Sequence, residues 1–239
     1  YIFDISDLDS PQRVASSFTL SGNGHGMALA GTGLFIAVED TSAEVHMYDI
    51  SSPSTLRAAD LLDSENIPGD DRARSLAYYD GYLYVGATED GTESEMYSFS
   101  VSGGGDITLL DEFDTEGSLN AITLKDGYAF FGSSEDVAEL RVLDVFDPAD
   151  LQNAPGNGYN LTDVYDGIAV AGFGTGILIG RMNGAIIEEL VLFDVADGPV
   201  PSPPPGPFYN EISGNANDIF VEPGGRYAFI ATDFSDKEL

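Results

Sequence analysis

The sequence predicts an all-β protein, namely a five-bladed β-propeller built from four-stranded antiparallel blades. Three observations predict it: a phrase that recurs every 44 to 51 residues, a hairpin pattern before each copy, and the lack of a convincing helical period of 3.6 residues. Repeats of this length with four strands each are typical of propellers, whose blades stand around a central channel.

The recurring phrase is a glutamate, a run of alternating apolar residues and a closing residue before a polar turn. The complete copies are EVHMYDISSP, EMYSFSVSG, ELRVLDVFDP and ELVLFDVADGP. A fifth copy is split between the ends, because the chain finishes KEL and starts YIFDISDLDSP. The closing residues are Asp4, Asp49, Ser100, Asp144 and Asp194, and the five steps between them, counted through the joined ends, equal 239 residues. We therefore expect strands from both termini to close the last blade.

Each phrase is preceded by an expected hairpin, two apolar strands around a glycine-bearing turn. The five segments are MALAGTGLFIAVED, LAYYDGYLYVGATED, ITLKDGYAFFGSSED, IAVAGFGTGILIG and IFVEPGGRYAFIATD. Asp-Gly and Gly-Gly pairs between apolar runs are a hairpin signal. An outer strand such as TLRAADLL or ITLLDEF completes each blade. The single domain 1–239 then divides into blades at about 21–64, 65–114, 115–165, 166–213, and 214–239 together with 1–20.

The phrases VHMYDISSP, ELRVLDVFDP and YIFDISDLDSP, each followed by a strand and a hairpin of the DGYLYVGA kind, resemble the LVIVD-repeat β-propeller family. The resemblance extends over the whole chain, except that residues 95–101 depart from the pattern at Ser98 and Ser100. It implies a propeller fold and a secreted or cell-surface setting, and it carries no catalytic signature.

The charge balance excludes two classes of partner. The chain contains nine Lys and Arg but 41 Asp and Glu, which gives a net charge of −32. This charge repels nucleic acid and anionic membranes. The acids are spread along the whole chain, as in proteins of salt-loving microbes, and we expect the fold to require salt that screens their repulsion. An ordinary acidic domain of a mesophile is the alternative.

Other classes of site lack the residues they need. Cysteine is absent and the only histidines are His25 and His46, so disulfides and sites built from Cys or His ligands are not expected. No run of 18 apolar residues exists, and no serine-hydrolase, zinc-protease or P-loop motif appears. We expect no cofactor. Calcium or another hydrated cation stays open, although acidic clusters such as residues 89–95 match no calcium loop.

One set of positions predicts a ligand site. The residue just before each innermost strand faces the channel mouth, and the hairpins place there, or near there, His25, Arg74, Asn120, Asp166 and Asn217. The last two positions are uncertain by one or two residues. All five are polar and comprise four residue types, which predicts a shared pocket for a small anion, a sugar or a hydrated cation. A solvated funnel holding ordered water is the alternative.

Smaller features have structural interpretations. The aspartates that close the phrases suit Asx turns, and the glutamates that open them are expected at outward or edge positions. The segment PVPSPPPGPF from Pro199 is a stiff spacer or a partner-binding loop, and Asn160-Leu161-Thr162 is a glycosylation sequon that matters only outside the cell.

We therefore expect a non-catalytic extracellular or cell-surface recognition module of a halophile, whose partners are proteins or glycans. The first alternative is a structural subunit of a surface filament or virion that assembles with copies of itself or with neighbouring subunits. The second is a glycoside hydrolase or lyase with a carboxylate pair. Nucleic-acid binding and membrane insertion of this segment are not expected.

Overall fold

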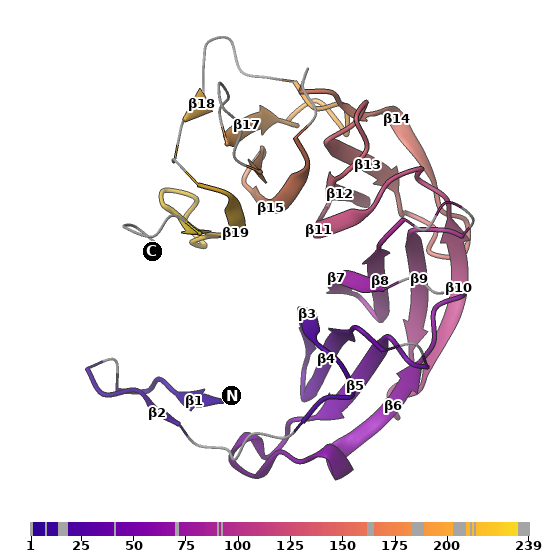
Figure 1. Cartoon of the computed structure of the whole chain (residues 1–239), viewed down its shortest axis with the longest axis vertical. Helices are drawn as coiled ribbons and strands as arrows, with labels where there is room; N and C mark the ends of the chain where they lie inside the picture. Colours follow the sequence, from indigo (N-terminus) through magenta and orange to yellow (C-terminus); the bar gives the residue numbers. More distant parts are fainter. Residues whose placement is uncertain are drawn as a thin grey trace.

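The computed structural model describes residues 2–7, 9–13, 19–40, 42–69, 72–89, 91, 93–161, 165–182, 189–202, 209–210, 212 and 214–233. Within these ranges the chain is all-β apart from two single-turn 3-10 helices, η1 (Pro53–Thr55) and η2 (Ala58–Asp60). Figure 1 shows the sheets standing one after another around a central opening, which is a propeller arrangement.

Four antiparallel four-stranded blades follow one another along the chain. Blade 1 contains β3 (Gly24–Ala30), β4 (Gly33–Val38), β5 (Val45–Asp49) and β6 (Leu61–Glu65). Blade 2 contains β7 (Ala73–Tyr79), β8 (Tyr82–Ala87), β9 (Met96–Val101) and β10 (Ile107–Phe113). Blade 3 contains β11 (Leu119–Lys125), β12 (Tyr128–Ser133), β13 (Leu140–Asp144) and β14 (Gln152–Tyr159). Blade 4 contains β15 (Gly167–Phe173), β16 (Gly176–Arg181), β17 (Leu190–Asp194) and β18 (Tyr209–Asn210).

All five expected inner hairpins are present, the fifth as β19 (Ala216–Val221) paired with β20 (Ala228–Thr232). The expected outer strand ITLLDEF is β10, but TLRAADLL is mostly not a strand. The segment contains the last residue of η1 and all of η2, and β6 starts only at Leu61. β6 follows η2 directly and pairs with β5 from Leu61 onward, with a register shift between Met47 and Tyr48.

Apolar side chains on both faces of the blades pack between neighbours. The four seams centre on Phe35 and Val85, Tyr84 and Phe131, Phe130 and Ile179, and Leu178 and Ile219. Near the channel the first strand of the next blade comes close to the second strand of the blade before it. A Cβ at Gly86 would lie 2.8 Å from Leu119, and one at Gly180 would lie 2.6 Å from Ala216, so glycine permits this approach.

Two separate two-stranded sheets lie outside the four blades. The hairpin β19–β20 packs on blade 4, and the short pair β1 (Phe3–Asp4) and β2 (Gln12–Arg13) lies at the other end of the ring. Ile2 packs against the apolar cluster of blade 1 that contains Ile36, and the two strand pairs do not pair with each other among the described residues. Figure 1 shows the ring open between them. The prediction of an all-β propeller is confirmed, whereas one blade closed by both termini is not seen, and the joining residues 234–239 lie outside the described ranges.

The glutamates that open the phrases are buried, so their expected outward or edge position is wrong. Glu44, Glu95, Glu139 and Glu189 are each 1% exposed. Their carboxylates accept the backbone N–H groups of Ile67, Thr115, Leu161 and Ile212 at 2.9, 2.7, 2.6 and 3.0 Å. Each N–H lies two residues beyond the fourth strand of the same blade. The carboxylate therefore satisfies a backbone donor where the chain leaves the sheet, which explains why every repeat carries it.

The aspartates that close the phrases form the expected Asx turns. Asp4, Asp49, Asp144 and Asp194 each accept the backbone N–H of the residue two positions later, at 2.8 to 3.0 Å. Ser100, which departs from the pattern, instead lies at the end of a longer strand and directs its hydroxyl at the carbonyl of Thr108, 3.5 Å away.

Candidate functional site

The candidate site at the channel is built by five β-bulges. In each inner hairpin the register shifts near the start of the first strand, so that a residue is left out of the ladder. The residues at these shifts include His25, Arg74, Asn120, Ile168 and Asn217. A bulge re-aims a side chain away from the regular alternation. All five side chains line one cavity of about 380 Å³, together with Met182 and Asn215.

Four of the five sequence-predicted residues therefore meet in one cavity. Asp166 is the exception, because β15 starts at Gly167 paired with Arg181, and this register puts Ile168 at the bulge. Asp166 lies two residues earlier, and burial together with the charge of Asp136 raises the pKa of its carboxyl.

Sequence reasoning missed Met182 and Asn215. Neither belongs to a strand, so the strand pattern contains no signal that would have found them.

The cavity is neutral to positive in a strongly acidic protein. Although 41 of the 239 residues are acidic, none of the seven lining residues is. The Nε atom of Arg74 is buried and makes no hydrogen bond to a described residue, and the guanidinium forms no ion pair among them. His25 lies 3.7 Å from Glu39, whose pKa is lowered by the Asn23 amide and by nearby cationic groups.

These groups suit recognition of an anion. A guanidinium offers a fork of N–H donors that matches carboxylates and other oxyanions, and asparagine amides add neutral donors. Asn120 already donates to the carbonyl of Gly167 at 3.0 Å, which holds its side chain at the cavity wall. The paired-acid hydrolase alternative needs two carboxylates here, and the lining residues supply none. Among the described residues no cluster of three acidic or histidine side chains could hold a metal.

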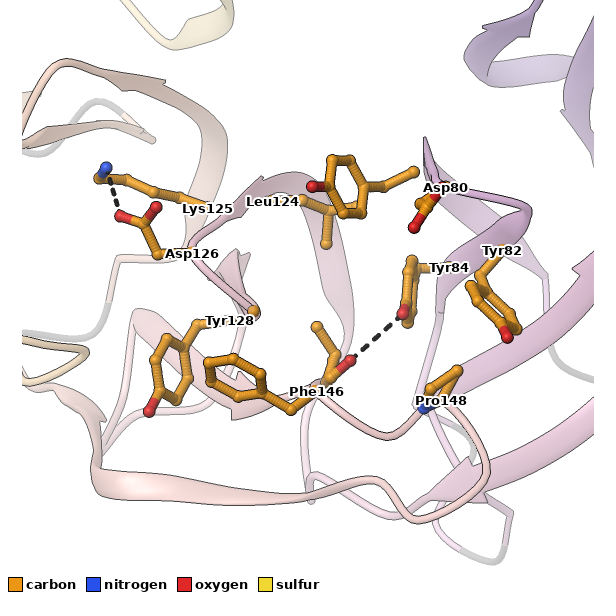
Figure 2. A pocket seen from close by; sticks show the side chains of 12 residues that line it. Asp80, Tyr82, Tyr84, Leu124, Lys125, Asp126, Tyr128, Phe146 and Pro148 are labelled. Carbon is orange, nitrogen blue, oxygen red and sulfur yellow. Dashed lines mark hydrogen bonds and ion pairs between the residues drawn. The ribbon is translucent and has the colours of Figure 1, made fainter.

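A second and larger cavity, of about 710 Å³, lies between blades 2 and 3 at the ends of their inner hairpins. Figure 2 shows Tyr82, Tyr84 and Pro148 on one side and Tyr128 and Phe146 on the other. The rings of Tyr128 and Phe146 meet edge to face, with centroids 5.3 Å apart. Five of the twelve residues that line this aromatic cleft carry aromatic rings, and Asp80, Lys125 and Asp126 add charged groups.

Sequence reasoning did not single out this aromatic cleft. The signal lies in the two hairpins YYDGYLYV and LKDGYAFF, where Asp-Gly turns are followed at once by tyrosine. Tyr82 faces Tyr79 across one turn, and Tyr128 faces Lys125 across the other. Placing both turns beside one another required knowledge of how blades 2 and 3 pack.

Two further predicted features lie at the limits of the described chain. Asn160 donates through its amide to the carbonyl of Asp136 at 3.1 Å, while Thr162 of the same sequon lies outside the described residues. In the proline-rich segment, Ser202 forms an isolated antiparallel β-bridge with Asp194. Residues 203–208 lie outside the described ranges. No helix in the described part of the chain is long and apolar enough to cross a membrane.

Comparison with known proteins finds similarity in fold only. No family model and no curated protein matches the chain. The solved structure of the computationally designed Ika4 protein is 14% identical with a TM-score of 0.53, covering 77% of this chain and 98% of the designed one. Two structures of the extracellular domain of BT4673 from B. thetaiotaomicron are 13% and 14% identical, with TM-scores of 0.56 and 0.59.

These matches differ in how much of each chain they cover. The two BT4673 matches cover 89% and 95% of this chain but only 26% and 28% of the other. This chain therefore spans about a quarter of the BT4673 domain it resembles. At such low identity, these similarities establish that the chain has a propeller-like fold. They establish nothing about its ligands or its activity.

Proposed function

We propose that this chain is a non-catalytic recognition module, a cell-surface or extracellular propeller of the LVIVD-repeat kind from a halophile, which binds a small anion at its channel mouth. One observation carries the proposal. Five bulges direct side chains of four types into one cavity, whose described lining residues include an arginine and no carboxylate, in a chain of net charge −32. A funnel that holds only water has no physical reason to lack aspartate and glutamate, which are the commonest charged residues of this protein.

The proposal includes a closed ring of five blades. β1 and β2 supply the third and fourth strands of the blade whose first two strands are β19 and β20. The burial pattern supports this. The residue three positions before the end of the second strand is Phe35, Tyr84, Phe130 or Leu178 in blades 1 to 4, at most 8% exposed, but Phe229 in the fifth hairpin is 54% exposed. Met27, on the facing side of blade 1, is 70% exposed.

The anion site is tested by thermal unfolding at constant ionic strength. Replacing part of the chloride by acetate, phosphate or sulfate should raise the Tm of the wild type in an anion-specific order. In Arg74→Gln this order should disappear, whereas Arg57→Gln, an exposed arginine far from the cavity, should keep it. An order that persists in Arg74→Gln would contradict the proposal.

A second candidate is a subunit of a surface assembly, and the open seam favours it. Phe3, Phe220 and Phe229 are all more than half exposed at the two halves of the unfinished blade. If the N-terminal pair of one copy completed the fifth blade of the next, copies would join head to tail. Light scattering at molar KCl separates the candidates, because a recognition module closed on itself stays monomeric over a wide concentration range.

A further inference from the structure

We propose that the aromatic cleft between blades 2 and 3 binds a neutral oligosaccharide. This inference rests on the proposed recognition role and gives that role a second site with its own ligand class. It is carried by the faces of the aromatic rings, the chemistry of the rim, the anchoring of the floor and the tyrosines found at the start of the second strand in these two hairpins only.

The cleft presents flat apolar surfaces to solvent. Tyr79 is 68% exposed and Phe146 is 67% exposed, and both line the same cavity as Tyr82. Large exposed rings gathered around one hollow are unusual in a soluble protein unless a ligand covers them. A pyranose ring has one face made of C–H groups, which stacks on such rings and leaves its hydroxyl groups at the edge.

The rim offers both donors and acceptors to those hydroxyl groups. Asp80 and Asp126 have positive φ values of 49° and 52°, so two Asp-Gly turns of the type I′ kind hold their carboxylates at the cleft. Lys125 donates to Asp126 at 2.7 Å and adds a cationic donor at the same edge. A sugar hydroxyl both donates and accepts, so it can use each of these groups.

The floor of the cleft is held in place without a ligand. The backbone N–H of Phe146 donates to Asp144 at 3.0 Å, and the hydroxyl of Tyr84 donates to the carbonyl of Val145 at 3.3 Å, as Figure 2 shows for the latter. Burial raises the pKa of Tyr84 to about 12, so its hydroxyl remains a donor at all relevant pH. A preformed site loses little entropy when a ligand binds.

Among the described hairpins, only the two at this seam start their second strand with tyrosine, and the fifth hairpin has Ala228 there. The first residue of the second strand is Tyr82 in blade 2 and Tyr128 in blade 3, but Gly33 in blade 1 and Gly176 in blade 4. The fold is built equally well with either residue type, so folding does not require tyrosine here. Positions at which otherwise similar repeats differ are those free to serve binding.

The charge of the protein selects among ligands that could stack on the rings. A net charge of −32 disfavours acidic sugars and nucleotides. Asp80 and Asp126 at the rim would attract an organic cation at low salt, but molar salt reduces the Debye length to about 3 Å and weakens that attraction. Stacking and neutral hydrogen bonds persist under those conditions, which leaves neutral saccharides as the ligand class.

The experiment measures binding at 2 M KCl by isothermal titration and by saturation-transfer NMR of the ligand. The probes are cellotriose, maltotriose and triacetylchitotriose, with tetramethylammonium and glucuronic acid as charged comparisons. At least one neutral trisaccharide should bind, with a Kd that rises tenfold or more in Tyr79→Ala and in Phe146→Ala. Tyr79→Phe should retain binding because it keeps the ring. Tyr227→Ala, an exposed tyrosine of another hairpin, should bind as the wild type does.

Each other outcome overturns the inference in its own way. Failure of all three trisaccharides to bind at millimolar concentration, or binding that Tyr79→Ala and Phe146→Ala leave unchanged, would refute a saccharide site in the cleft. Binding of tetramethylammonium alone would replace the ligand class by an organic cation. Loss of saccharide binding in Arg74→Gln alone would move the site to the channel. Neither failure of the trisaccharides to bind nor binding unchanged in Tyr79→Ala and Phe146→Ala would affect anion binding at Arg74. The proposed function would then stand without this inference.

Discussion

Replacing Phe229 by alanine tests whether the ring closes in solution. The side chain is 54% exposed in the open arrangement, and Phe35, at the same position of blade 1, is fully buried. A phenylalanine buries about 200 Å² at most, so covering the exposed half removes about 100 Å² from water, worth about 2.5 kcal/mol. If the fifth blade packs on blade 1, Phe229→Ala should cost about 3 kcal/mol or more, close to the 3–5 kcal/mol expected for Phe35→Ala.

The assay is urea unfolding at 2 M KCl, since urea, unlike guanidinium, leaves the ionic strength unchanged. Met27 lies on the facing side of the seam and is 70% exposed in the open arrangement. If closure brings the two together, the double variant with Met27→Ala should show a coupling of about 0.5 kcal/mol or more. The closed seam would be refuted by three results together. Phe229→Ala would lower the free energy of unfolding by less than about 1 kcal/mol, its effect and that of Met27→Ala would be additive, and Phe35→Ala would still cost about 3–5 kcal/mol.

Three further predictions concern charge. Raising KCl from low to molar concentration should raise the Tm, by roughly 2–4 °C for each 1 kcal/mol of repulsion relieved, and a Tm independent of salt would contradict the halophile assignment. Glu95→Ala should cost about 1–3 kcal/mol in urea because the Thr115 N–H loses its acceptor, whereas Glu95→Gln keeps an acceptor and should cost far less. Burial raises the pKa of Glu44, Glu95 and Glu135, so the folded state binds more protons than the unfolded state between their ordinary and raised pKa values. The urea midpoint of the wild type should therefore rise as the pH falls from 7 into that window. In Glu95→Gln the urea midpoint should change less with pH.

The sequence predicted the repeat far better than it predicted side-chain environments. Hairpins and Asx turns depend on local spacing, and all five hairpins formed as expected. The recurring glutamate was misjudged because a charged residue at a strand start is usually exposed. Its backbone partner lies 20 to 23 residues later, as in the pair Glu44 and Ile67, so no local pattern reveals it. The aromatic cleft was missed for the same reason, since Tyr82 and Phe146 belong to different blades.

Comparing the repeats separates positions that build the fold from positions that serve a site. The buried glutamate recurs in all four complete blades and accepts the same backbone hydrogen bond in each, so its recurrence has a structural cause. The bulge position also recurs, because every inner hairpin has a register shift there, but its side chain changes from histidine to arginine, asparagine and isoleucine. A conserved backbone irregularity with a variable side chain is what a propeller needs to build one asymmetric site from similar repeats. Arg74 is therefore the first residue to replace, because it supplies the one guanidinium among the described residues that line the cavity.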